Sequence, residues 1–101
     1  MGQQSEDINL TTLPQKMFFP HRILIMKILS KQSEIYFQDL KNKLNLTEGN
    51  LVSHLRALEA EGLTTFRKEI NGKRVRTMNC ITPKGKELYK EFCESMIEVL
   101  K

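Results

Sequence analysis

The spacing of apolar residues changes at Gly62, and this change limits the fold more than any other feature of the sequence. Before Gly62 the leucines recur at helical spacing, whereas the runs 64–70 and 73–81 alternate and are rich in β-branched residues. The two runs flank Asn71-Gly72, a dipeptide that accepts the positive φ angles of a type I′ turn. We therefore expect a β-hairpin that turns at Asn71-Gly72 and follows directly after a helix.

A two-residue turn at these positions sets the register of the hairpin. In that register Glu69 faces Arg74, which is favourable, but Arg67 faces Arg76. Like charges directly opposite each other destabilise a strand pair. A hairpin that keeps such a pair is suited to binding phosphates, which would neutralise it. The other interpretation is a charged hairpin that protects the edge of a sheet from aggregation.

Three further segments have the patterns of a strand or a helix. Residues 20–31 begin at a proline and are apolar around nearly the whole helix, which predicts a helix buried on two sides. Ile35-Tyr36-Phe37 is typical of a short extended piece, and it leads into a helix over 37–44. Thr82-Pro83 provides an N-cap and a first helical position for a last helix that runs to the end of the sequence.

The segment 47–62 predicts a helix of an unusual kind. Thr47 is a good N-cap, a stripe of leucines faces inward, and Gly62 suits the C-terminal cap. Its far side is small and polar, and holds Gly49, Asn50, Ser53, Arg56, Ala57 and Ala60. A solvated helix face is usually rich in Lys and Glu, whereas a helix that enters a groove needs short side chains. Two helices joined by a tight turn, the second with this face, indicate a helix-turn-helix.

Composition and charge limit the classes of function that we expect for the chain. Residues 62–86 carry a net charge of +6 in a chain whose total is +4, which indicates a surface for a polyanion or a solvated basic face. No apolar stretch is long enough to span a membrane, and no signal peptide is expected, so we expect a cytoplasmic protein without a membrane partner. Cys80, Cys93, His21 and His54 lack metal-ligand spacing, and no catalytic constellation is visible. We expect no metal, no cofactor and no enzyme.

The last helix has more apolar surface than its own core requires. The side chains that we assign to a homodimer interface are Tyr89, Phe92, Cys93, Met96, Ile97 and Leu100. Cys93 lies among them, either as a buried apolar cysteine or as a thiol switch.

Three motifs in order resemble winged-helix regulators of the MarR/ArsR type. The run 46–63 is similar to their recognition-helix segment, and Ile81-Thr82-Pro83-Lys84-Gly85 is similar to their strand-to-helix junction. Pro20-His21-Arg22-Ile23-Leu24 is similar to the opening of their first helix. The resemblance covers residues 18–90. It implies an α+β, mainly helical fold, the winged helix-turn-helix, with a three-helix core, a β-hairpin wing and a C-terminal helix.

The resemblance also implies a division of the chain and a function. Residues 1–17 are an arm or a short helix, 18–82 the DNA-binding core, and 83–101 the dimerisation helix. The expected function is that of a sequence-specific regulator, a repressor, that binds double-stranded DNA as a homodimer; no effector is assigned. The alternative is a winged-helix protein-interaction module without a role in DNA binding, which would show exposed apolar residues on the wing and the outer helix face.

The DNA-binding residues that the resemblance implies fall into two sets. The recognition helix contributes Thr47, Glu48, Gly49, Asn50, Ser53, His54 and Arg56, and the wing contributes Arg67, Lys68, Lys73, Arg74 and Arg76. Asn side chains pair with adenine edges and Ser pairs with either base type, whereas the wing cations reach phosphates or the minor groove. His54 flanks the apolar stripe, so it is either a DNA contact or a packed, hydrogen-bonded histidine.

Overall fold

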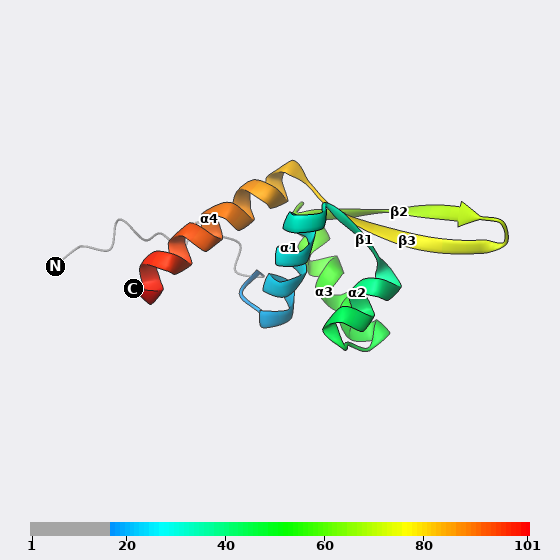
Figure 1. The fold of residues 1–101 in the computed structure, drawn as a ribbon, viewed down its shortest axis with the longest axis horizontal. Coiled ribbons are helices and arrows are strands. Elements are labelled where there is room, and N and C mark those ends of the chain that lie inside the picture. The colour runs from blue at the N-terminus through cyan, green and yellow to red at the C-terminus, as the bar shows by residue number, and fades with distance from the viewer. Residues whose placement is uncertain (1–16) are drawn as a thin grey trace.

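The computed structural model describes residues 17–101. Along the chain lie α1 (Pro20–Gln32), β1 (Glu34–Tyr36), α2 (Phe37–Leu44), α3 (Glu48–Ala60), β2 (Thr64–Asn71), β3 (Arg74–Ile81) and α4 (Pro83–Leu100) (Figure 1). The expected order of elements and the mainly helical α+β class are confirmed. Apart from Met17, the predicted N-terminal arm over residues 1–17 lies outside the described residues.

The starts of the three longer helices follow the local signals in the sequence. Pro20 opens α1, where its missing N–H needs no partner. The Thr47 hydroxyl accepts a hydrogen bond from the backbone N–H of Asn50 at 3.1 Å and so caps α3. The Thr82 hydroxyl accepts one from the N–H of Gly85 at 2.9 Å and caps α4. The turn between α2 and α3 passes through Asn45, which has φ 53°.

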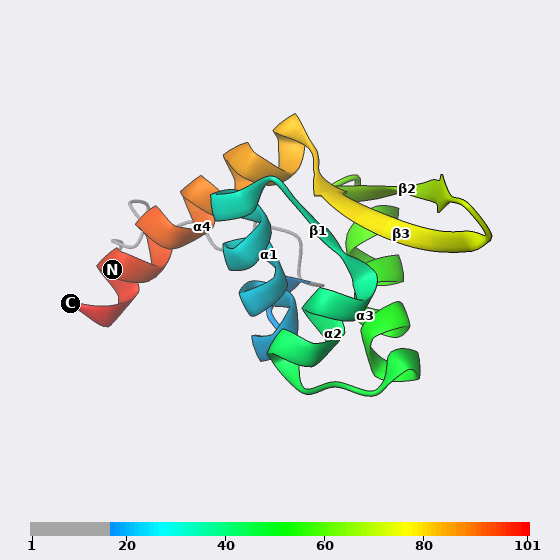
Figure 2. The same ribbon diagram turned by 45° about the vertical axis from the view of Figure 1, so that its right-hand side comes forward.

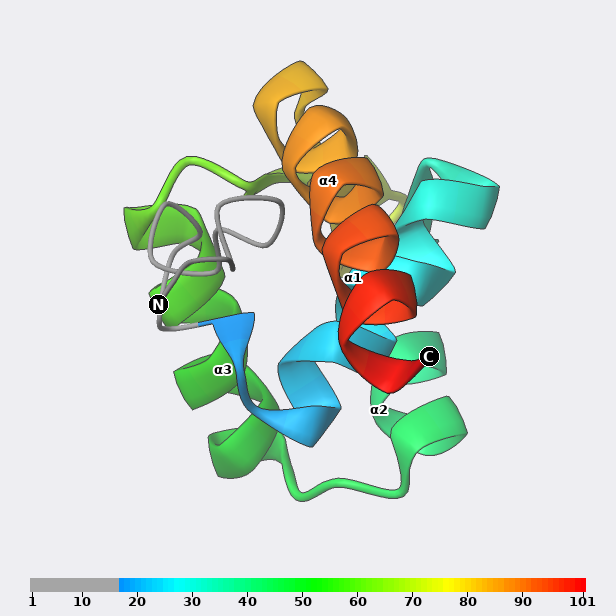
Figure 3. The same ribbon diagram turned by 90° about the vertical axis from the view of Figure 1, so that its left-hand side faces the viewer.

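Helix α1 lies at the centre of the molecule and packs against α2, α3 and α4 (Figure 3). The prediction that it is buried on more than one side is therefore confirmed. Leu24 nevertheless stays exposed. The core side chains come from the four helices, from β1 and from two positions between elements, and they are Met17, Ile25, Met26, Leu29, Ile35, Leu40, Leu51, Leu55, Leu58, Leu63 and Phe92.

The strands form one antiparallel sheet in the order β1-β3-β2. The hairpin β2–β3 projects away from the helices, on the opposite side from the C-terminal end of α4 (Figures 1 and 2). Because side chains alternate along a strand, the register divides the hairpin into two faces. The outer face holds Arg67, Glu69, Arg74, Arg76, Met78 and Cys80, with Glu34 and Tyr36 of β1. The inner face holds Thr64, Phe66, Lys68, Ile70, Val75, Thr77, Asn79 and Ile81.

The predicted register of the hairpin is wrong. Asn71 pairs with Arg74, so the turn consists of Gly72 and Lys73 rather than Asn71 and Gly72. Gly72 has φ 67°, and neither Asn71 nor Lys73 has a positive φ. A single positive φ at the first turn position is the pattern of a type II′ turn, which favours glycine there. As a result Arg67 faces Met78, and the like-charge pair that was expected to attract phosphates does not exist.

The junction between β3 and α4 is held tightly against the end of α3. The Thr82 hydroxyl lies 2.7 Å from the carbonyl oxygen of Gly62 and 3.1 Å from that of Leu63. A Cβ atom at Gly85 would overlap the Leu63 carbonyl oxygen. Glycine is therefore required at position 85, and this close approach fixes the direction in which α4 leaves the core.

Candidate nucleic-acid interface

The outward side of α3 is polar and open. Of the predicted recognition residues, Thr47, Glu48, Gly49, Asn50, Ser53 and Arg56 are all exposed. A Cβ atom at Gly49 would have nothing within 4 Å. The Thr47 hydroxyl already caps the helix, so its position is set by the fold. Around Gly49, Asn50 and Ser53, this part of α3 thus presents a narrow surface of short side chains, as the sequence predicts.

His54 is placed differently from the other predicted recognition residues. It is half-buried, and its Nδ1 accepts a hydrogen bond of 2.9 Å from Nε of Arg22 on α1. Its ring also lies near that of His21, with 5.6 Å between the centroids. Burial lowers the pKa of His54 below 6.5, and the charges of Arg22 and His21 lower it further. These contacts favour the packed, hydrogen-bonded histidine over the DNA contact.

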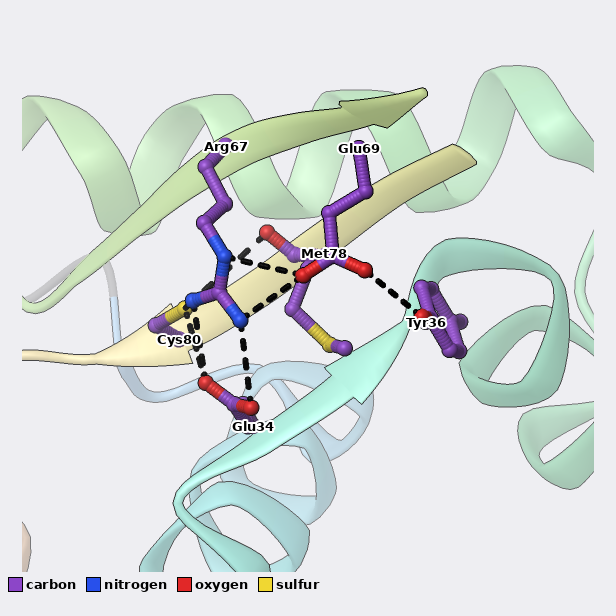
Figure 4. Close-up of polar contacts among 6 residues, drawn as sticks. All are labelled: Glu34, Tyr36, Arg67, Glu69, Met78 and Cys80. Carbon is purple, nitrogen blue, oxygen red and sulfur yellow. Dashed lines mark hydrogen bonds and ion pairs between the residues drawn. The ribbon is translucent and has the colours of Figure 1, made fainter. Parts of the chain in front are cut away.

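Two of the five predicted wing cations, Arg67 and Arg76, belong to a network on the outer face, and Figure 4 shows the part around Arg67. Arg67 forms ion pairs with Glu34 at 3.0 Å and with Glu69 at 2.8 Å. The Tyr36 hydroxyl donates to Glu69 at 2.7 Å, and the Arg76 guanidinium lies 3.6 Å from the centre of the Tyr36 ring. This network ties the wing to β1 and stiffens it.

The network also sets the charge states of its carboxylates. The hydrogen bond from Arg67 lowers the pKa of Glu34, and the bonds from Tyr36 and then Arg67 lower the pKa of Glu69. The bond to Glu69 in turn raises the pKa of Tyr36. Glu34 is exposed and Glu69 half-buried at the surface of the sheet, so the network acts mainly on geometry. The sequence reasoning missed Glu34 and Tyr36, because no local signal shows that β1 pairs with β3.

The other wing cations lie elsewhere on the hairpin. Lys68 is on the inner face and donates a hydrogen bond of 2.8 Å to the Thr77 hydroxyl. Lys73 and Arg74 lie at the turn, exposed, and neither has an ion pair within residues 17–101. The predicted wing residues are therefore divided between two faces and the tip.

A cleft of about 350 Å³ separates α3 from the inner face of the wing. Arg56 lines it on the helix side and Lys68 on the strand side, so cations stand on both walls. Two carboxylates, Glu48 and Glu59, also line it, and burial raises the pKa of Glu59. The cleft joins the outer face of α3 to the wing as one continuous surface.

The predicted dimer residues on α4 differ in how much surface they offer. Phe92 is buried against Phe18, with 5.3 Å between ring centroids, so it belongs to the chain's own core. Tyr89, Cys93 and Met96 are half-buried, and burial raises the pKa of Tyr89 to about 12. Ile97 and Leu100 are largely exposed, at 59% and 76%. The free apolar surface of α4 is thus confined to its last turns.

Neither a metal cluster nor a membrane-spanning helix occurs in the described part of the chain. Residues 17–101 contain no group of three or more His, Cys, Asp or Glu side chains that could hold a metal ion. None of the helices in this range is long and apolar enough to cross a membrane.

Comparisons with known proteins agree with this geometry. Residues 21–100 match the family model of the winged helix DNA-binding domain. An uncharacterized protein of Methanocaldococcus jannaschii is 36% identical over 80 residues, which cover 79% of this chain and 87% of that protein. A transcriptional regulator homologue from Pyrococcus horikoshii OT3 is 38% identical, covers 84% of both chains and superposes with a TM-score of 0.80.

A structure of lower sequence identity has the same fold. The Staphylococcus aureus MarR protein, solved with salicylate and kanamycin, is 22% identical and has a TM-score of 0.65 over 82% of this chain and 54% of its own. It shares the winged-helix fold that the motifs at 20–24, 46–63 and 81–85 resemble. From its matched family model, its relatives and its fold, the chain belongs to the winged-helix DNA-binding domain family of transcriptional regulators.

Proposed function

We propose that this regulator is a homodimeric repressor that reads a specific sequence of double-stranded DNA with α3. The observation that carries the proposal is the outer side of α3, where Asn50 and Ser53 are exposed at the end of a capped helix. Side chains of this size fit the major groove, and both types form hydrogen bonds with base edges. The cations at the cleft and at the wing tip then hold the adjacent phosphates.

The exposed end of α4 supports the homodimer. Ile97 and Leu100 remain largely exposed within residues 17–101, and burying an aliphatic side chain contributes roughly 1.5–3 kcal/mol. In a two-fold dimer on DNA, the two copies of α3 lie about 34 Å apart and read a pseudo-palindrome. A dimer that occupies a promoter excludes other proteins from the same duplex, and we therefore expect repression.

Selection of bound duplexes from a random pool tests the proposal. The expected result is one enriched pseudo-palindromic motif, and binding of that duplex should reduce transcription in vitro from a promoter that contains it. In solution, wild type should have the mass of a dimer, while Ile97→Glu with Leu100→Glu should give a monomer. The absence of an enriched motif would refute sequence-specific binding, and a wild-type monomer would refute the α4 interface.

A second candidate function rests on a specific observation. Ile70 and Val75 on the wing are 76% and 61% exposed, and exposed apolar residues at this place are what a protein-interaction module would show. If this function holds, the selection yields no motif, and the wing binds a protein instead.

A further inference from the structure

The tip of the wing combines an apolar pair with free positive charge. Ile70 and Val75 face each other across the hairpin on its inner face. They form the cross-strand pair next to Asn71–Arg74, the last pair before the turn. At 76% and 61% exposure they are among the most exposed large apolar side chains in residues 17–101. Lys73 lies in the turn next to them, and Arg74 follows on the outer face of the hairpin. The hairpin's single acidic residue, Glu69, points to the outer face, where Arg67 and Tyr36 hold it.

The arrangement fits DNA better than a protein partner. A stable protein interface buries about 800 Å² on each side, far more than two side chains at a hairpin tip provide. The surroundings of the pair are cationic, because Lys73 and Arg74 are close in sequence and the carboxylate of Glu69 is already paired with Arg67. Apolar side chains flanked by Lys and Arg are how proteins enter the minor groove and separate adjacent base pairs.

The dimensions of the pair indicate what entry does to the duplex. Cross-strand side chains have Cβ atoms about 5 Å apart, so with their van der Waals radii they are wider than the minor groove of about 6 Å. Their entry therefore requires a wider groove, and apolar side chains that open the minor groove do so by inserting between base steps and partly unstacking them. The network Glu34–Arg67–Glu69–Tyr36 on the opposite face holds the hairpin against β1 while it does so (Figure 4).

We infer that the wing tip is a minor-groove wedge, in which Ile70 and Val75 unstack one base step while Lys73 and Arg74 hold the flanking phosphates. The inference rests on the proposed DNA-binding function. It adds that binding bends the DNA, and that part of the specificity comes from how easily the sequence beside the α3 contact deforms.

The experiment uses the full chain and the duplex recovered by selection, at about 30 base pairs. 2-Aminopurine replaces one adenine at a time in the flanks, and dyes at the two ends report bending. Wild type should raise the 2-aminopurine fluorescence at one step and bend the duplex by roughly 20–90°. The paired substitution Ile70→Thr and Val75→Thr should abolish both signals and lower affinity roughly tenfold. The salt dependence should not change, because no cation is removed.

The matched control exchanges the two side chains, Ile70→Val with Val75→Ile, and should keep the fluorescence rise and the bend. Thr is a good strand former, so the test variant should unfold at the wild-type temperature. Wild-type binding without any fluorescence rise, or a Thr variant that still unstacks the duplex, would overturn the wedge and leave the proposed function intact. No binding of any duplex by wild type would overturn both, and a Thr variant altered only in its oligomeric state would assign the pair to a protein contact.

Discussion

The outer side of α3 and the outer face of the wing are both polar, but their side chains are held in opposite ways. Asn50 and Ser53 on α3 make no side-chain hydrogen bond within residues 17–101. On the wing, Arg67 is held by two carboxylates, one of which also accepts a hydrogen bond from Tyr36. A free side chain adapts to a base edge, whereas a held one keeps a hairpin in place. The comparison therefore separates the surface that we propose to read sequence from one that supports position.

The largest expected effect tests the reading role of α3. Asn50→Ala with Ser53→Ala should reduce discrimination between the selected duplex and random DNA by roughly 1–3 kcal/mol for each base that is no longer read. Competition binding with the two duplexes measures this difference. The cap of α3 is formed by the Thr47 hydroxyl and the backbone of Asn50, so the helix should remain intact. Equal weakening on every sequence would move these residues to the phosphate-contacting class and break the comparison.

The second prediction tests the joint between the two regions. Gly85→Ala should lower the free energy of unfolding by about 1–3 kcal/mol, because the new Cβ meets the Leu63 carbonyl between α3 and β2. Gly49→Ala is the matched control, since its Cβ has open space and lies within α3. It should stabilise the protein by roughly 0.5–1 kcal/mol through helix propensity. Chemical denaturation measures both values, and similar results for the two variants would show that the joint is not tight.

The third prediction separates a free wing cation from a held one. Arg74→Ala should reduce the slope of log K against log[salt] by about 1, the value for a single phosphate neutralised by one cation. Arg67→Ala should leave the slope nearly unchanged, because Glu34 and Glu69 already neutralise Arg67. Binding isotherms at several salt concentrations give both slopes. A fall in slope for Arg67→Ala would return Arg67 to the phosphate contacts.

The smallest effect concerns acid. The pKa of His54 lies below 6.5, so its contribution to stability is full above that pH and is lost as the pH falls and the ring takes up a proton. The pKa values of Glu34 and Glu69 lie below 4.5, so their contribution is full above 4.5 and disappears only as the pH falls through the lowered values.

On acidification, the hydrogen bond between Arg22 and His54 should therefore be lost before the network that holds the wing to β1. The fall of the melting temperature with decreasing pH should become shallower below pH 6.5 in His54→Gln and below pH 4.5 in Glu34→Gln. Loss of the wing signals before those of His54 in an NMR titration would contradict the expected order.

The sequence predicts those parts of the fold that depend on neighbouring residues. Pro20, Thr47 and Thr82-Pro83 mark helix starts that the structure confirms. The hairpin was predictable, but its register was not, because Asn71-Gly72 and Gly72-Lys73 can both form a two-residue turn. In the structure Asn71 pairs with Arg74, which places Gly72, with φ 67°, at the first position of the turn.

In the candidate site, too, only the features that depend on neighbouring residues could be predicted from the sequence. Exposure of the small polar face of α3 follows from helical spacing alone. The partners of Arg67 do not, since Glu34 lies 33 residues away and meets it only because β1 pairs with β3. The burial of Phe92 likewise depends on Phe18, which precedes α1 by two residues and reaches α4 only in the folded chain.

The pairing of β1 with β3 also bears on how the protein assembles over time. Glu34 to Tyr36 meet Cys80 to Met78, so this contact must close a long loop, whereas β2 and β3 are joined by a two-residue turn. The hairpin is expected to form early and β1, only three residues long, to dock late and open first. Hydrogen exchange should therefore be faster at the amides shared by β1 and β3 than at those shared by β2 and β3. During folding, the wing would therefore pass through a stage in which the hairpin is formed but its orientation relative to the helices is not yet fixed.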